Sequence, residues 1–127
     1  IDLPPDRFCT ELTKAHQALS AFGPVRWFRP GGGRSTAAMR SAARQLGYRT
    51  ALGEVYPFDP HIPSVTWIRL HIAAVVRPGS IIVLHDRGAR GWRTAEALGH
   101  LLPALAARGY RVGTLSALVA QGDAAGE

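Results

Sequence analysis

The sequence has very little cysteine and no long hydrophobic run, and each absence excludes a class of protein. Cys9 is the single cysteine, so an internal disulfide and a multi-cysteine zinc site are both excluded, and Cys9 is expected to be a structural residue. No apolar stretch approaches the roughly 20 residues that a membrane-spanning helix needs. The chain starts without a methionine and without a visible signal peptide. We therefore expect it to begin inside a longer protein.

Histidine pairs with metal-binding spacing are also missing. Neither His-x-x-x-His nor His-Glu-x-x-His occurs among the five histidines, which are His16, His61, His71, His85 and His100. The sequence therefore predicts no metal site built from its own residues.

Lysine is almost absent, since Lys14 is the only one, and the formal net charge of +6 comes from arginine. The arginines are scattered over separate segments, without a basic run interleaved with stacking aromatic residues. This distribution argues against a nucleic-acid partner. The densest cluster, from Arg87 to Arg93, is expected to form a solvated or substrate-facing loop.

What the sequence does contain is an alternation of helical and strand patterns. A helix capped by Asp6 is expected to face the core with five residues: Phe8, Leu12, Ala15, Leu19 and Phe22. Three more helices are expected: one between Ser35 or Thr36 and Gly47, one that starts at Ser64, and one led by Thr94. The last of these is expected to be kinked or restarted at Pro103. Its inward-facing residues are Leu98, Leu101, Leu102 and Leu105. Strands are expected at Val25–Phe28, Tyr48–Leu52, Ile81–Leu84 and Tyr110–Leu115. The alternation predicts an α/β fold with a mainly parallel sheet.

In such folds the chemistry sits on loops at the carboxyl ends of the strands. This rule selects His85, which directly follows the apolar run Ile81–Leu84. An imidazole exchanges protons near neutral pH, which suits acid or base catalysis. The alternative is a histidine that merely closes the strand end through a hydrogen bond.

The same rule selects the loop from Arg29 to Gly33 and the carboxylate of Asp59. Glycines allow a backbone to approach a ligand and to bind an oxyanion through its N–H groups, and Arg29 could hold a carboxylate or a substrate oxygen. An ordinary glycine turn with a surface arginine explains this loop equally well. Asp59 could orient His85, or it could be a simple turn residue, and His61 is its nearest rival for a role in that loop.

Three segments together resemble the polysaccharide deacetylase family, the carbohydrate esterases that include chitin and peptidoglycan deacetylases. The first is Trp27–Gly33 followed by Ala42–Tyr48, similar to that family's Phe-Arg-Pro-Pro-Tyr-Gly motif and the helix after it. The second is Arg77–Asp86, similar to the family's late strand ending in Leu-His-Asp, and the third is the closing helix and strand, Leu101–Leu115. The resemblance covers nearly the whole chain in order and spacing.

The resemblance implies that residues 1–120 are the C-terminal portion of a distorted (β/α) barrel, followed by a flexible tail, 121–127. It implies removal of N- or O-acetyl groups from a chitin- or peptidoglycan-like polysaccharide, with a divalent metal, usually zinc, that activates water. His85 matches the acid that protonates the leaving amine, and Asp59 the carboxylate that supports it. Arg29, Pro30, Gly31 and Gly32 match the loop lining the groove, where the Gly32 N–H could bind the oxyanion.

The sequence departs from the family pattern at several points. Gly31 and Gly32 replace a proline and a tyrosine, and the acidic residue and tryptophan expected soon after Asp59 are replaced by Ile62 and Pro63. The family's early Asp-Asp pair and its histidine motif are absent, so we expect the metal to be bound by residues missing from this chain and the chain alone to be inactive.

The expected partners are an N-acetylated glycan and either the missing N-terminal segment or another copy of the chain. A secreted or extracytoplasmic parent protein is implied by the resemblance alone. The alternative function is a catalytically dead carbohydrate-binding or scaffold domain. Under either function Trp27, Trp67 and Trp92 could stack on sugars, although core packing is the expected role of most of them.

Overall fold

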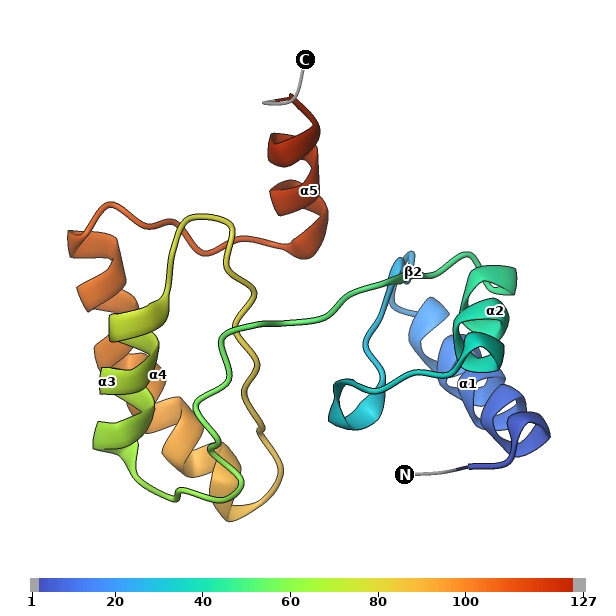
Figure 1. Ribbon diagram of the computed structural model, residues 1–127, viewed down its shortest axis with the longest axis horizontal. Helices are drawn as coiled ribbons and strands as arrows, with labels where there is room; N and C mark the ends of the chain where they lie inside the picture. Colours follow the sequence, from blue (N-terminus) through green and yellow to red (C-terminus); the bar gives the residue numbers. More distant parts are fainter. Residues whose placement is uncertain (1–2, 125–127) are drawn as a thin grey trace. The chain divides into compact units, whose positions relative to one another are not determined.

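The computed structural model describes residues 3–124, which form two compact units divided between Leu52 and Gly53 (Figure 1). The elements follow in the order α1 (Pro5–Ser20), β1 (Trp27–Phe28), η1 (Gly31–Gly33), α2 (Ala37–Gln45), β2 (Arg49–Thr50), α3 (Val65–Val75), α4 (Ala89–Ala107) and α5 (Leu115–Ala124). None of the described helices is both long and apolar enough to span a bilayer.

The first unit joins α1 and α2 to a short parallel strand pair. β1 and β2 are in register with Trp27 opposite Arg49 and Phe28 opposite Thr50. The α2 helix begins where the sequence predicts, because the Thr36 side chain accepts a hydrogen bond from the Met39 N–H at 3.1 Å and satisfies a free donor of the first turn. The buried cluster of this unit consists of Leu12, Ala42, Ala43 and Tyr48.

The second unit packs α3 beside α4 (Figure 1). Ser64 caps α3 as predicted, through its hydroxyl and the Trp67 N–H. Ile68 and Ile72 are almost fully buried on the inner face of this helix. They belong to a cluster that also contains Val55, Val76, Ala97, Leu101 and Leu105.

All four predicted strands are shorter than expected or absent: Val25–Phe28 is reduced to Trp27–Phe28, and Tyr48–Leu52 to Arg49–Thr50. Of Ile81–Leu84, only Ile82 pairs in a strand-like way, through an isolated parallel bridge to Val55. A strand needs a continuous backbone partner, and among the described residues only Val55 and its neighbours supply one here. Residues 110–114 form no strand, and α5 begins at Leu115 and runs to Ala124. This helix therefore includes part of the segment that the sequence predicts as a tail, and residues 125–127 lie outside the described range.

Helix boundaries and faces also differ in part from the prediction. Pro4, not Asp6, occupies the capping position of α1, because a proline is preset for the first turn. The α4 helix begins at Ala89, five residues before Thr94, after Gly88 turns the chain with φ 60°. Phe22 and Leu102 were predicted to face inward, yet they are 91% and 42% exposed. Phe22 lies beyond the end of α1, where helical periodicity no longer places a side chain.

Candidate active site

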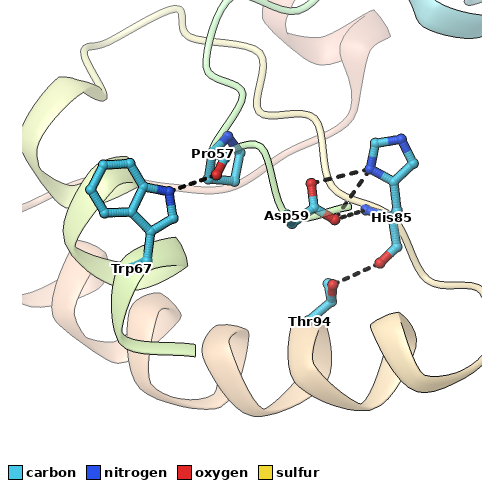
Figure 2. A network of polar contacts seen from close by, with 5 residues as sticks. All are labelled: Pro57, Asp59, Trp67, His85 and Thr94. Atoms are coloured by element: carbon cyan, nitrogen blue, oxygen red, sulfur yellow. Dashed lines mark hydrogen bonds and ion pairs between the residues drawn. The ribbon is translucent and has the colours of Figure 1, made fainter. Parts of the chain in front are cut away.

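The site is centred on a carboxylate and an imidazole that the fold brings into contact. Asp59 is buried, with 2% of its surface exposed, and it lies in the loop before α3. Its Oδ1 and Oδ2 atoms lie 3.1 and 3.2 Å from Nδ1 of His85, and Oδ2 also accepts the His85 backbone N–H at 3.0 Å (Figure 2). The predicted contact between these two residues is therefore present in the structure.

The parallel bridge explains why two residues 26 positions apart meet. Val55 and Ile82 pair in the same direction, with the Val83 N–H donating to the Val55 carbonyl at 2.9 Å. Asp59 and His85 follow a few residues after these partners, so both arrive at the same edge. The strand-end rule thus holds here although only one bridge of the sheet is formed.

Each side of the pair is anchored by a further hydrogen bond (Figure 2). On one side, the Trp67 indole N–H donates to the Pro57 carbonyl at 2.8 Å, which fixes the chain two residues before Asp59. On the other, the buried Thr94 hydroxyl donates to the His85 carbonyl at 2.7 Å and ties the strand end to α4. These two hydrogen bonds therefore attach the chain on either side of the pair to α3, through Trp67, and to α4, through Thr94.

Glu54 anchors the other end of the bridged segment. Its Oε2 accepts the Ile81 N–H at 3.2 Å. Burial raises the pKa of Glu54, but hydrogen bonds from the Ser80 hydroxyl and the Ile81 N–H, together with the charge of Arg77, outweigh burial and leave the pKa below its ordinary value of 4.5. The ionised carboxylate is therefore the form that holds the start of this segment.

The geometry determines which nitrogen of His85 is available for chemistry. An ionised carboxylate only accepts hydrogen bonds, so Nδ1 carries the hydrogen that faces Asp59. Nε2 lies on the side of the ring away from Asp59 (Figure 2). The His85 side chain is 34% exposed whereas that of Asp59 is 1% exposed. The pair therefore presents one oriented ring nitrogen to solvent, with its support buried behind it.

The predicted groove loop lies in the first unit. Pro30 is fully buried, Arg29 is exposed, and the Gly33 N–H donates to the Pro30 carbonyl at 3.1 Å. Gly32 has φ 64°, a left-handed conformation that the tyrosine of the family motif would adopt only with strain. The glycines thus serve a tight turn after β1, and the roles of Arg29, Pro30, Gly31 and Gly32 in substrate binding stay predictions.

The other candidates take no part in the pair. His61 is exposed, and its backbone N–H donates to the Phe58 carbonyl at 2.8 Å. His16 contacts the Tyr48 hydroxyl at 3.0 Å, as befits a residue at the edge of the first core. Within residues 3–124, no three His, Cys, Asp or Glu side chains gather as a metal site would require. The described residues do not fit a catalytic metal, so no chemical step through one is derived from them.

Three neighbours of the pair were not assigned these positions from the sequence, which named only Trp67 among them as a possible sugar-stacking residue. Tyr56 places its ring 5.9 Å from that of His85, Trp67 fixes Pro57, and Thr94 holds the His85 carbonyl. The sequence offered only one signal for Thr94, a helix-capping residue type ahead of an apolar stripe. Its true role depends on a contact nine residues away that no local pattern encodes.

Known proteins share both the sequence and the fold. The chain is 37% identical over 94 residues to a peptidoglycan-N-acetylglucosamine deacetylase of Bacillus cereus, an alignment covering 72% of this chain and 44% of that protein. It is 33% identical over 109 residues to a chitooligosaccharide deacetylase of Azorhizobium caulinodans, covering 76% of this chain and 51% of that protein. The chain belongs to the polysaccharide deacetylase family. It spans about half the length of these curated relatives.

Solved structures agree with this polysaccharide deacetylase assignment. A CE4 family pseudoenzyme of Bacillus anthracis matches with a TM-score of 0.79 and 25% identity, over 91% of this chain and 41% of that protein. A mutant of that pseudoenzyme with restored enzymatic activity matches with a TM-score of 0.80 and 26% identity, over 91% of this chain and 42% of that chain. No family model matches the chain. The matches confirm the predicted α/β class and the family resemblance.

Proposed function

We propose that this chain supplies the proton-donating part of a metal-dependent deacetylase that removes N- or O-acetyl groups from a chitin- or peptidoglycan-like polysaccharide. The observation that carries the proposal is the buried Asp59 carboxylate in contact with Nδ1 of the half-exposed His85. The relatives named as deacetylases of peptidoglycan N-acetylglucosamine and of chitooligosaccharide support the substrate class.

The role assigned to His85 is to protonate the leaving nitrogen of the glucosamine as the bond between the carbonyl carbon and that nitrogen breaks. The doubly protonated imidazolium donates this proton from Nε2, because Nδ1–H is engaged by Asp59, and the ring is left neutral with its hydrogen on Nδ1. Asp59 keeps the ring in the required tautomer and stabilises the charged imidazolium, as a buried carboxylate does behind a catalytic histidine. The family resemblance assigns the loop with Arg29, Pro30, Gly31 and Gly32 to the substrate groove, with the Gly32 N–H as the group that would bind the oxyanion.

The proposed metal, zinc, would be held by residues missing from this chain, where it would supply Lewis-acid activation of the acetyl carbonyl. It follows that the chain alone is inactive and that activity belongs to the complete domain. The glycan is the proposed partner, and the rest of the domain, or a second copy of the chain, completes the site.

The decisive test replaces the two residues of the pair in the complete domain and measures acetate release from an N-acetylglucosamine tetramer. His85→Gln and Asp59→Asn are each expected to lower kcat by roughly 10²- to 10⁴-fold, the usual contribution of an oriented general acid. His100→Gln, an exposed histidine on α4, is the matched control and should leave kcat unchanged. Normal acetate release by His85→Gln would rule out the proposed acid.

A second candidate is a carbohydrate-binding domain without catalysis. It is favoured by one observation, the structural likeness to a CE4 family pseudoenzyme. Glycan binding without acetate release by the complete, zinc-loaded domain would select this candidate over the first.

A further inference from the structure

A row of aromatic rings extends from the Asp59–His85 pair along the second unit. The Tyr56 ring lies 5.9 Å from His85, and the Phe58 ring lies 4.8 Å from Tyr56. His71 follows at 6.4 Å from Phe58, and Trp67 at 5.4 Å from His71. We call these four residues, Tyr56, Phe58, His71 and Trp67, the aromatic row. The aromatic row begins beside His85, the residue assigned to proton transfer.

Phe58 is held where neither burial nor the turn requires a phenylalanine. Its φ is 56°, and it is the one non-glycine residue with positive φ in the described part of the chain. A bulky side chain adopts this conformation only at a cost in strain, which glycine or asparagine would avoid. Phe58 is 48% exposed, so core packing does not compensate for the strain. Strain of this kind is typical of positions at which a side chain is presented to a ligand.

Trp67 is presented in a comparable way. Its indole N–H is fixed by the Pro57 carbonyl at 2.8 Å, and Figure 2 shows the nitrogen turned toward that carbonyl. The side chain nevertheless remains 40% exposed. His71, one helical turn further along α3, packs against the same ring. An oriented aromatic ring that stays accessible loses little conformational entropy when a ligand covers it.

The chemistry of the row fits a sugar ring better than a purely apolar ligand. A pyranose has an apolar C–H face bordered by hydroxyls, which needs flat aromatic surface with polar groups beside it. Phe58 and Trp67 each supply a partly exposed ring, and polar aromatic residues border them, since His71 lies between the two and Tyr56 lies between Phe58 and His85. We propose that the aromatic row binds the sugar residues of the glycan adjacent to the acetylated residue at His85. This inference rests on the proposed function. It adds a binding place for the sugar residues that flank the acetylated one.

The test is a titration of the chain with chitotriose, the trimer of N-acetylglucosamine, followed by calorimetry and by amide chemical shifts. Phe58→Asn relieves the backbone strain, so the variant should fold while losing one ring of the row. It is expected to raise the Kd for chitotriose by roughly tenfold or more, as truncation of an aromatic anchor does. The matched control is Leu70→Asn, an apolar residue on α3 that is 63% exposed and outside the row, and its Kd should stay within about twofold.

Two results would overturn the inference: a wild-type chain that does not bind chitotriose, or a Phe58→Asn variant that binds it as well as wild type does. Loss of concentration-dependent dimerisation in Phe58→Asn, with glycan binding unchanged, would reassign the row to contacts between copies. Acetate release by the complete domain is a separate readout. Binding that depends on Phe58 without acetate release would refute the proposed function and leave the aromatic row as a glycan site.

Discussion

Asp59 is the residue on which the local structure of the site depends most. Its two carboxylate oxygens satisfy both the ring Nδ1 and the backbone N–H of His85, while its side chain is almost inaccessible to water. A buried carboxylate is tolerated only when its oxygens are satisfied in this way. The same residue therefore serves the fold and the proposed chemistry, and the two contributions can be separated experimentally.

Asp59→Ala should lower the free energy of unfolding of the second unit by about 1–3 kcal/mol, because the His85 N–H loses its acceptor in a partly buried place. Chemical denaturation followed by tryptophan fluorescence measures the change. Glu96→Ala, an exposed acidic residue on α4, is the control and should stay within about 0.5 kcal/mol of wild type. An Asp59→Ala variant as stable as wild type would mean that water replaces the carboxylate without cost.

At the scale of elements, the bridged pair of segments is held together by a close backbone approach. Gly53 lies where an added Cβ would meet the Ile81 carbonyl oxygen at 2.8 Å and would come closer still to the Val83 side chain. Two residues later Val55 makes the parallel bridge to Ile82. A glycine at this point therefore allows the two segments to approach as closely as the bridge requires.

Gly53→Ala should destabilise the second unit by about 1–3 kcal/mol, because backbone, unlike a flexible side chain, cannot yield to the added methyl group. Gly99→Ala in the middle of α4 is the matched control, since nothing lies within 4 Å of its Cβ position. It should stabilise the chain by about 0.5–1 kcal/mol through helix propensity. Thermal unfolding of both variants gives the comparison, and equal effects of the same sign would contradict the close approach.

Glu54 gives the same element a dependence on pH. Because its pKa is held below 4.5 in the folded chain, its contribution to stability is fully present above pH 4.5 and is lost as the pH falls through the folded pKa. Glu54→Gln should therefore be less stable than wild type at neutral pH, and this difference should shrink as the pH is lowered below 4.5. A series of denaturant titrations at different pH values measures it, and a difference that is independent of pH would show that the charge is not involved.

At the scale of the whole molecule, residues 3–124 contain two buried clusters, one in each unit, with no residue in common. Leu12, Ala42, Ala43 and Tyr48 form the first, and seven residues around Ile68 and Ile72 form the second. Residues that share buried apolar contacts unfold cooperatively, so we expect the part of the chain around each cluster to unfold separately from the other. A single melting temperature would then be a poor description of the chain.

Ile72→Ala should lower the opening free energy of amides in residues 53–124 by about 2–5 kcal/mol and leave those of residues 3–52 unchanged. Native-state hydrogen exchange, read residue by residue, measures both units in one sample. Leu12→Ala provides the reciprocal case, with its loss confined to the first unit. Equal loss of protection in both units after Ile72→Ala would mean that the chain opens as one cooperative body.

The sequence by itself determined what depends on neighbouring residues. Thr36 and Ser64 begin their helices as predicted, and Gly47 and Gly109 end theirs with φ 78° and 82°, because capping and left-handed turns are decided within a few residues. The meeting of Asp59 with His85 was also predictable. It needs only that two parallel segments end at the same edge, which the alternation of elements already implies.

Only the tertiary structure decided what depends on distant partners. The run Ile81–Leu84 has the composition of a buried strand, yet a strand needs neighbours, and in the described chain it has one bridge. Residues 110–114 form no strand for the same reason, and α5 follows them from Leu115. Phe58, Trp67 and Thr94 became parts of the site through a strained turn and two hydrogen bonds between residues nine and ten positions apart. Local propensity is summed over a few residues, whereas these contacts are fixed by which surfaces pack together.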